Sequence, residues 1–175
     1  SPHGTMVLST MAADITGEYL GTAPKANYAL YLTEDITKET WTEEDNWIAA
    51  AERADSIGAD VCNTSLGYTE MDDPSFSHTY SDMDGNTLLI SIAADIAASK
   101  GMLMVNSAGN SGQADWFHIG APADGDSVLA IGACDVDGFM APFSSRGPSA
   151  DGEVKPNVTA PGWNVAVISD HGVFE

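Results

Sequence analysis

A short polar loop holds the side chain of this sequence that is best suited to chemistry. Residues 107–112 read Ser-Ala-Gly-Asn-Ser-Gly. The side chain of Asn110 is a neutral N–H donor that can meet a developing negative charge, and Gly109 lets another backbone approach closely. Gly-Asn-Ser-Gly is also good turn chemistry, so an ordinary exit from a strand is the alternative interpretation.

A second chemical group, the imidazole of His3, stands near the start of the chain. Residues 6–13 are apolar nearly all round and predict a buried helix. His3 would then lie at the amino end of that helix. Taken alone, a histidine near a terminus carries no functional argument.

The elements that must position these groups alternate between helix and strand. The apolar run 102–105 predicts a strand buried on both faces, with the loop 107–112 at its carboxyl end. In open α/β sheets, ligands bind at that edge. The sequence therefore predicts an α/β fold with a largely parallel sheet flanked by helices. Further strands are expected at 26–32, 59–66, 128–133 and 165–168, and helices at 47–57, ended by Gly58, and 88–99, capped by Thr87.

Loops fill the rest of the pattern. Residues 33–44 form a polar loop, and residues 155–162 are expected to form a turn. The acidic segment 68–86 is 19 residues long. A loop of that length in a compact domain is functional or a lineage-specific insertion.

Composition indicates a folded chain with a strongly acidic surface. The 175 residues are 43% hydrophobic, enough for one domain with a sizeable core. Twenty-six acidic residues against 6 basic ones give a formal net charge of −20, which argues against nucleic acid and anionic membranes as partners. No apolar run approaches the roughly 20 residues that span a bilayer. We expect a secreted, cell-surface or periplasmic protein. The start Ser-Pro-His-Gly, without a methionine, suggests a fragment or a processed chain.

The two cysteines, Cys62 and Cys134, each stand inside an apolar, strand-like run. They are expected to be buried free thiols that pack as small hydrophobic side chains, although a disulfide stays open. No Cys/His cluster has zinc-ligand spacing.

Seven blocks, taken together and in order, resemble the subtilisin-like serine proteases (subtilases, peptidase S8 family). The resemblance covers nearly the whole chain except 68–86 and parts of 33–46. It implies that residues 1–175 are part of one catalytic domain with a three-layer α/β fold, running from the histidine motif to the turn before the serine motif. The blocks are 3–13, 21–32, 60–67, 105–112, 128–135, 143–148 and 155–162.

The resemblance also implies roles for particular residues. His3 would be the general base that takes a proton from a serine hydroxyl and later returns it to the leaving amine. Asn110 would donate to the tetrahedral oxyanion. Small residues along one wall of the pocket would admit medium or large apolar side chains. The substrate-binding residues implied for a polypeptide substrate are Ser65, Leu66 and Gly67, which pair with its backbone by strand addition, and Ser107, Ala108, Gly109 and Gly120.

Two family motifs have no match in the chain. The family's catalytic aspartate lies in Asp-Thr-Gly or Asp-Ser-Gly, and its nucleophile in Gly-Thr-Ser-Met-Ala, and neither sequence occurs here. Ser111 and Ser145 lie near the motifs, but no second base accompanies them. We therefore expect a triad that is incomplete and inactive alone, and a sheet incomplete at both ends. Its unpaired backbone groups would make the chain self-associate or require the missing segments. The alternative is a non-catalytic pseudoprotease that keeps the peptide groove.

The chemistry itself requires no cofactor, but a structural metal is considered. Asp82-Met83-Asp84-Gly85 resembles the start of a calcium loop. The twelfth position of such a loop, where an EF-hand has Glu, is Ala93. Two interpretations stay open: a structural calcium site at Asp82 and Asp84, or a solvated turn before the next helix.

Overall fold

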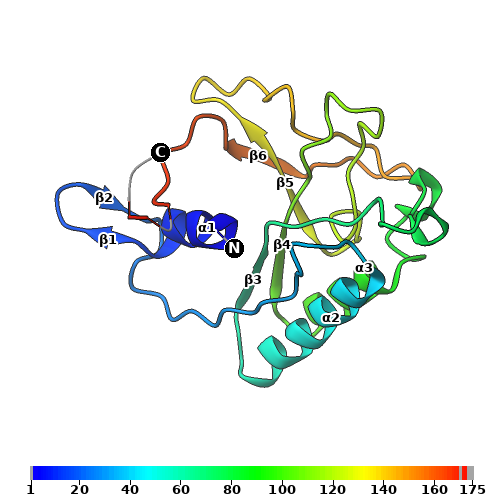
Figure 1. Ribbon diagram of the computed structural model, residues 1–175, viewed down its shortest axis with the longest axis horizontal. Helices are drawn as coiled ribbons and strands as arrows, with labels where there is room; N and C mark the ends of the chain where they lie inside the picture. Colours follow the sequence, from blue (N-terminus) through cyan, green and yellow to red (C-terminus); the bar gives the residue numbers. More distant parts are fainter. Residues whose placement is uncertain (1, 170, 173–175) are drawn as a thin grey trace. The chain divides into compact units, whose positions relative to one another are not determined.

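The computed structural model describes residues 2–169, 171 and 172, which divide into two compact units (Figure 1). The first unit consists of the described residues of 1–30 and 164–175. The second unit spans residues 31–163 and contains the parallel sheet. No described helix is long and apolar enough to cross a membrane.

The first unit is built on one helix and a short hairpin. The helix α1 (Pro2–Ala12) forms where a helix was predicted, and His3 lies in its first turn. Only Ser9 of this helix is buried, so the prediction of a buried helix is wrong in that respect. The small antiparallel hairpin of β1 (Asp14–Ile15) and β2 (Tyr19–Leu20), absent from the prediction, follows α1 directly.

Residues 165–168 do not form the strand expected of them. They contact both α1 and β2. The Ile168 amide donates to the Ser9 hydroxyl of α1 at 2.9 Å, and the Tyr19 hydroxyl of β2 donates to the Ala166 carbonyl at 2.9 Å. Side-chain hydrogen bonds therefore help to hold this segment in the first unit.

The second unit contains a four-stranded parallel sheet, which confirms the α/β prediction. The strands are ordered β3-β4-β5-β6, and every neighbouring pair is parallel. Short apolar runs with small polar residues at their carboxyl ends form the first three strands, as the sequence predicts. The bounds are β3 Val61–Thr64, β4 Leu103–Ser107, β5 Leu129–Cys134 and β6 Val158–Pro161.

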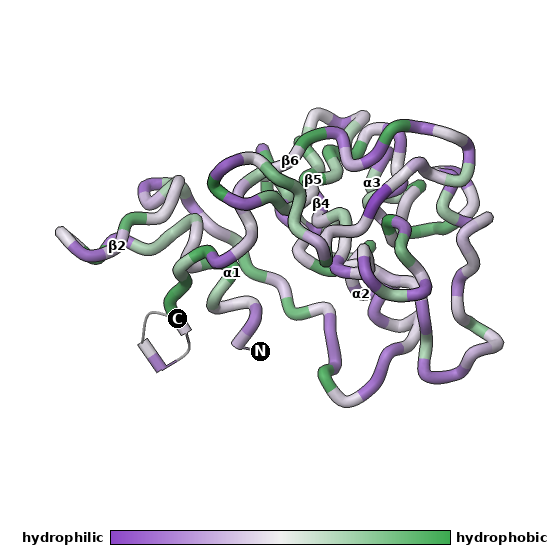
Figure 2. Tube along the Cα trace, turned by 90° about the horizontal axis from the view of Figure 1, so that it is seen from above, coloured by the Kyte–Doolittle hydropathy of each residue, from purple (hydrophilic) through white to green (hydrophobic). Residues whose placement is uncertain are grey.

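Helices α2 (Trp41–Ser56) and α3 (Leu89–Ser99) pack together and against the sheet. Hydrophobic stretches gather where β4 and β5 lie side by side (Figure 2). The Trp47 indole also donates to the Thr64 hydroxyl at 3.1 Å, which ties α2 to β3. The buried core includes Trp47, Ala51, Ala54, Ile90, Ala94, Ala97, Met102 and Met104.

Both helices begin differently from the prediction. Helix α2 starts at Trp41 rather than Trp47, because Thr40 and Glu43 form a capping box in which the Thr40 amide donates to the Glu43 carboxylate at 2.8 Å. Helix α3 has Leu88 as its N-cap. The hydroxyl of Thr87, the expected cap, instead donates to Asp84 at 2.8 Å. Gly58, with φ +77°, follows α2 as predicted.

The strand β4 is not buried on both faces, as its apolar run had suggested. Met104 and Asn106 are buried, whereas Leu103 is 49% exposed and its neighbour Val61 on β3 is 55% exposed. Helices α2 and α3 cover the face that carries Met104. Among the described residues of the second unit, no helix covers the opposite face.

Two further predictions are wrong. Residues 26–32 form no strand, since no described strand pairs with them, and Leu30 and Leu32 are 70% and 82% exposed. The division between the two units falls within this segment. Residues 155–162, expected as a turn, contain β6, which pairs with β5 along residues 131–134. The turn-forming residues Pro156 and Asn157 stand just before that strand.

The long segment 68–86 is irregular, as predicted, and includes two short 3-10 helices at Pro74–Phe76 and Tyr80–Asp82. It is anchored in the core by buried Tyr68, Met71 and Met83. Both cysteines are free thiols; Cys134 is buried and Cys62 is half-buried.

Candidate functional site

The second unit contains a pocket of about 150 Å³ at the carboxyl ends of β3 and β4. Every site residue predicted for this unit, apart from the two calcium candidates, lines it. Five more residues complete the wall. The lining consists of the predicted Ser65, Leu66, Gly67, Ser107, Ala108, Gly109, Asn110 and Gly120, with Thr69, Ser111, Trp116, His118 and Ser145 in addition.

Strand register explains why two distant segments meet here. Thr64 at the end of β3 is opposite Asn106 of β4, so both strands leave the sheet at the same edge. The buried Asn106 amide then donates to the carbonyls of Leu66 at 3.2 Å and Ser107 at 2.9 Å. One side chain thus holds the two walls of the pocket at a fixed spacing.

Ser145 fixes the loop that follows β4. Its amide donates to the Gly109 carbonyl at 2.9 Å, and its hydroxyl accepts from the Ser111 amide at 2.9 Å. Gly109 has φ +108°, and a Cβ atom there would lie 2.8 Å from the Ser145 hydroxyl oxygen. Both the backbone conformation and the close approach therefore require glycine.

Asn110 is held on the loop between these two contacts. Its side chain is exposed, and it makes no hydrogen bond with another described residue. The amide is therefore free to donate to a ligand at the pocket edge. His3, the other predicted catalytic residue, is exposed in α1 of the first unit. Because each unit is described by itself, a joint action of His3 and Asn110 stays a prediction.

Trp116 and His118 form an aromatic part of the pocket wall. The imidazole of His118 stacks on the Tyr80 ring with centroids 3.9 Å apart, and the Phe117 ring meets it edge-on at 5.4 Å. The Trp116 indole donates to the Ile119 carbonyl at 3.0 Å. Sequence reasoning missed this wall. The cluster of aromatic residues just before Gly120 is the signal that could have indicated it.

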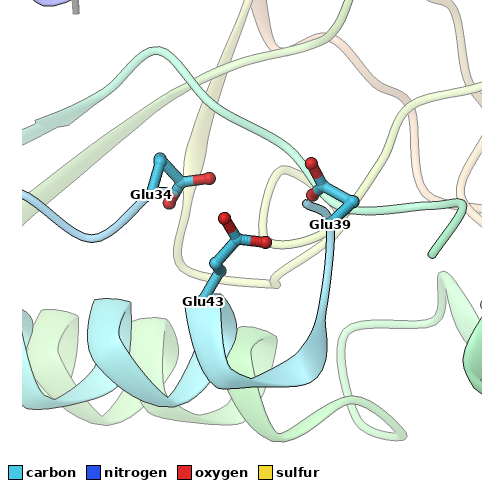
Figure 3. Close-up of side chains that lie close together, drawn as sticks. All are labelled: Glu34, Glu39 and Glu43. Atoms are coloured by element: carbon cyan, nitrogen blue, oxygen red, sulfur yellow. The ribbon is translucent and has the colours of Figure 1, made fainter. Parts of the chain in front are cut away.

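A group of carboxylates lies beside the segment that leads into α2. Oxygens of Glu34, Glu39 and Glu43 lie within 4.8 Å of one another (Figure 3). Glu34 accepts a hydrogen bond of 2.6 Å from the hydroxyl of Tyr68, next to Gly67 in the pocket wall. Burial, and then repulsion from neighbouring carboxylates with Glu43 first, raises the pKa of Glu39 to about 7. This group therefore concentrates negative charge behind the pocket wall.

The two carboxylates proposed for calcium serve as caps of local turns. Asp82 accepts from the amide and hydroxyl of Thr79 at 2.7 and 2.8 Å. Asp84 accepts from the amides of Asn86 and Thr87, and the first of these bonds lowers the pKa of Asp84. Neither belongs to a described group of three close ligand atoms; those groups are Glu34, Glu39 and Glu43, and Asp126, Asp151 and Glu153. A calcium site at Asp82 and Asp84 stays a prediction.

The sequence family explains why these loops converge. The sequence model of the subtilase family (peptidase S8) matches residues 1–173. The chain belongs to the subtilase family. Subtilisin DY of Bacillus licheniformis is 37% identical over 165 residues, which cover 93% of this subtilase chain and 52% of the relative. Subtilisin E of Bacillus subtilis (strain 168) is 33% identical over 177 residues, which cover 99% of the chain and 40% of the relative.

Solved structures agree on the fold. The patellamide maturation protease PatA superposes with a TM-score of 0.78 at 24% identity, over 100% of this chain and 58% of that one. The PatG macrocyclase, solved in complex with peptide, superposes with a TM-score of 0.73 at 20% identity, over 97% of this chain and 45% of that one. This subtilase chain thus spans about half the length of the relatives that it matches.

Proposed function

We propose that the protein is a serine endopeptidase of the subtilisin type, to which this chain contributes the peptide groove, the general base and an oxyanion donor. Family membership over residues 1–173 supports the activity. The observation that carries the proposal is the pocket in which the ends of β3 and β4 place Ser65–Gly67 opposite Ser107–Gly109, with Asn110 in the same lining. Its substrate is a polypeptide.

The groove would bind substrate through its backbone. The segment 65–67 continues past the end of β3 and offers main-chain groups for strand addition. The side chain that precedes the scissile bond would enter the pocket between the two walls. Small residues at 107–109 and at Gly120 leave that space open.

The chemistry then follows from two polar side chains. His3 takes the proton of the attacking serine hydroxyl and returns it to the leaving amine. Asn110 donates to the oxyanion of the tetrahedral intermediate, and its freedom from other hydrogen bonds leaves the donor available. The serine and aspartate motifs do not occur in these 175 residues, so the chain alone is inactive. Catalysis by the groove and oxyanion donor without a nucleophile would be negligible.

A second function is a peptide-binding pseudoprotease. One observation favours it: the pocket is formed entirely within the second unit, without a Gly-Thr-Ser-Met-Ala motif in the chain. The presence of His3 and an unbonded Asn110 favours the protease instead, because a peptide binder needs neither. No cofactor is required for either function.

A serine-directed phosphonate probe separates the two functions. We expect the full-length gene product to be labelled and the 175-residue chain to stay unlabelled. Asn110→Ala in the full-length protein should reduce kcat by about 10²–10³-fold, the loss known for removal of such a donor from subtilisin, a relative of this chain. Peptide binding without labelling of the full-length protein would establish the pseudoprotease. Labelling of the 175-residue chain would contradict its inactivity.

The protein is also proposed to act outside the cytoplasm, as secreted, cell-surface or periplasmic. One relative, the minor extracellular protease Vpr of Bacillus subtilis (strain 168), is 36% identical over 131 residues, which are 75% of this chain. The net charge of −20 disfavours nucleic acid and anionic membranes as partners.

A further inference from the structure

One residue of the pocket lining, His118, is held in place by contacts of both its ring and its backbone. The ring of His118 stacks on Tyr80, whose hydroxyl donates to the carbonyls of Pro148 and Ser149 at 2.9 and 3.1 Å. The backbone on either side of His118 pairs with Arg146, through the Phe117 carbonyl and the Ile119 amide, each at 3.1 Å. The imidazole is therefore preorganised within the lining of the pocket.

The two ring nitrogens of His118 have different surroundings. Nδ1 is buried and has no hydrogen-bond partner. Nε2 has no partner among the described residues either, but it is not buried, so it is the ring nitrogen that a ligand can reach.

The tautomer follows from this difference. A neutral imidazole has one N–H donor and one acceptor nitrogen. Nδ1 is unpaired in either tautomer, but a buried N–H left unpaired is rarer in proteins than a buried acceptor left unpaired, and a proton on Nε2 can be donated to a ligand. The favoured tautomer has its proton on Nε2, and the ring then presents an N–H donor to the pocket.

The rest of the lining favours a polar but not a basic side chain. None of the 13 lining residues is a carboxylate, so a lysine or arginine side chain would find no counter-charge there. The Arg146 guanidinium lies 5.7 Å from the centre of the Phe117 ring. The cavity of about 150 Å³ exceeds the space that a single water needs, so it has room for a side chain.

We infer that His118 is a specificity-determining residue, which selects peptides whose pocket side chain ends in an uncharged acceptor oxygen, as in glutamine. This inference rests on the proposed peptide groove and replaces the expectation of an apolar preference. The hydrogen bond from Nε2 to that oxygen uses a donor that the folded chain leaves without a partner. Methionine has nearly the same length and no such oxygen, so it is the matched reference.

The test compares peptides that differ only at the side chain entering the pocket: glutamine, glutamate, methionine and lysine. For the full-length protein, we expect kcat/KM for glutamine to exceed that for methionine by about three- to tenfold, the contribution of one net hydrogen bond. Comparison of glutamate with glutamine separates the charge of the acceptor from its geometry. His118→Phe keeps a ring on Tyr80 but removes the donor, and should bring the glutamine-to-methionine ratio close to one.

The control variant is Arg53→Gln, an exposed α2 residue outside the lining, which should preserve the ratio. Equal rates for glutamine and methionine in the unaltered protein would overturn the inference, as would a ratio that survives His118→Phe. If no peptide is cleaved and the phosphonate does not label the protein, the proposed endopeptidase function fails. Fluorescence anisotropy with the same labelled peptides then gives the binding ratio, which still decides the role of His118. His118→Gln, with an amide donor, is the second variant should His118→Phe not fold.

Discussion

His78 Nε2 lies 2.6 Å from Glu44 Oε1, and both side chains are buried. This contact joins the long irregular segment 68–86 to the first turns of α2. The same segment carries Tyr80, on which His118 stacks in the pocket. The buried pair therefore supports the pocket wall as well as the fold of the segment.

Removal of His78 should destabilise the second unit. His78→Ala leaves the Glu44 carboxyl buried without its partner, and we expect a loss of about 3 kcal/mol in the free energy of unfolding. Urea denaturation measures it. In the double variant Glu44→Leu/His78→Leu, neither partner is left alone, so it should lose less than His78→Ala. An equal or larger loss in the double variant would show that packing, not the unpaired carboxyl, sets the cost.

Stability should also depend on the protonation of Glu39. Its pKa is raised to about 7 in the folded chain from 4.5. The folded state therefore binds more protons than the unfolded state between these values, and stability falls as pH rises through this window. Because Glu39 is only partly buried, solvent screening reduces the effect to on the order of 1 kcal/mol.

Glu39→Gln removes this dependence. We expect the variant to melt at a higher temperature than the unaltered protein at pH 8, and at nearly the same temperature at about pH 3.5, where the carboxyl is largely protonated in both states. Glu52→Gln on the exposed face of α2 is the control with the same change of charge. An identical pH profile in Glu39→Gln and the unaltered protein would rule out Glu39 as the source.

The residue types in the sequence predicted the strands of the sheet better than the segments that connect them. The apolar runs of β3, β4 and β5 were visible in the sequence because a buried strand needs them. The early start of α2 was also encoded, in the spacing of Thr40 and Glu43, but was overlooked. Residues 26–32 have the composition of a strand, yet a strand forms only where a partner can complete its ladder. No single-sequence pattern contains that information.

In the pocket too, part of the wall could be predicted from the sequence and part could not. Its two predicted walls came from the motifs around Ser65–Gly67 and Ser107–Asn110. The role of His118 depends on Tyr80, far away in the sequence, and on an unpartnered ring nitrogen. The aromatic cluster at Trp116 and Phe117 could have indicated a wall, but nothing in the sequence places Tyr80 against His118.

Gly109→Ala should damage the pocket more than Gly138→Ala does. An alanine at this position would have to keep φ +108°. Its methyl group would also lie 2.8 Å from the Ser145 hydroxyl oxygen. We expect a loss of about 2–3 kcal/mol in stability, combining backbone strain and crowding, together with weaker peptide binding. Gly138→Ala has a positive φ of 85° but nothing within 4 Å, so it should show the strain alone. Equal losses in the two variants would exclude the contact with Ser145.

The proposed calcium site makes a separate prediction. If Asp82 and Asp84 bind calcium, added Ca²⁺ should raise the melting temperature, by an amount equivalent to about 2.7 kcal/mol at 100 times the Kd. Asp84→Asn should abolish the rise, while Glu39→Gln in the other carboxylate group should preserve it. A melting temperature unaffected by Ca²⁺ would exclude the site. A rise lost only in Glu39→Gln would place the ion at Glu34, Glu39 and Glu43 instead.

The 175-residue chain is expected to self-associate when it is isolated. Strand β3 is at one edge of the sheet, and Val61 and Leu103 expose apolar side chains on the face that α2 and α3 do not cover. A free strand edge next to apolar surface favours pairing with another chain. Analytical ultracentrifugation should detect dimers or larger species, and Leu103→Lys should shift them toward monomer because it charges that face. A monodisperse monomer that unfolds cooperatively would contradict the prediction, since it would show that the exposed edge and face need no neighbour.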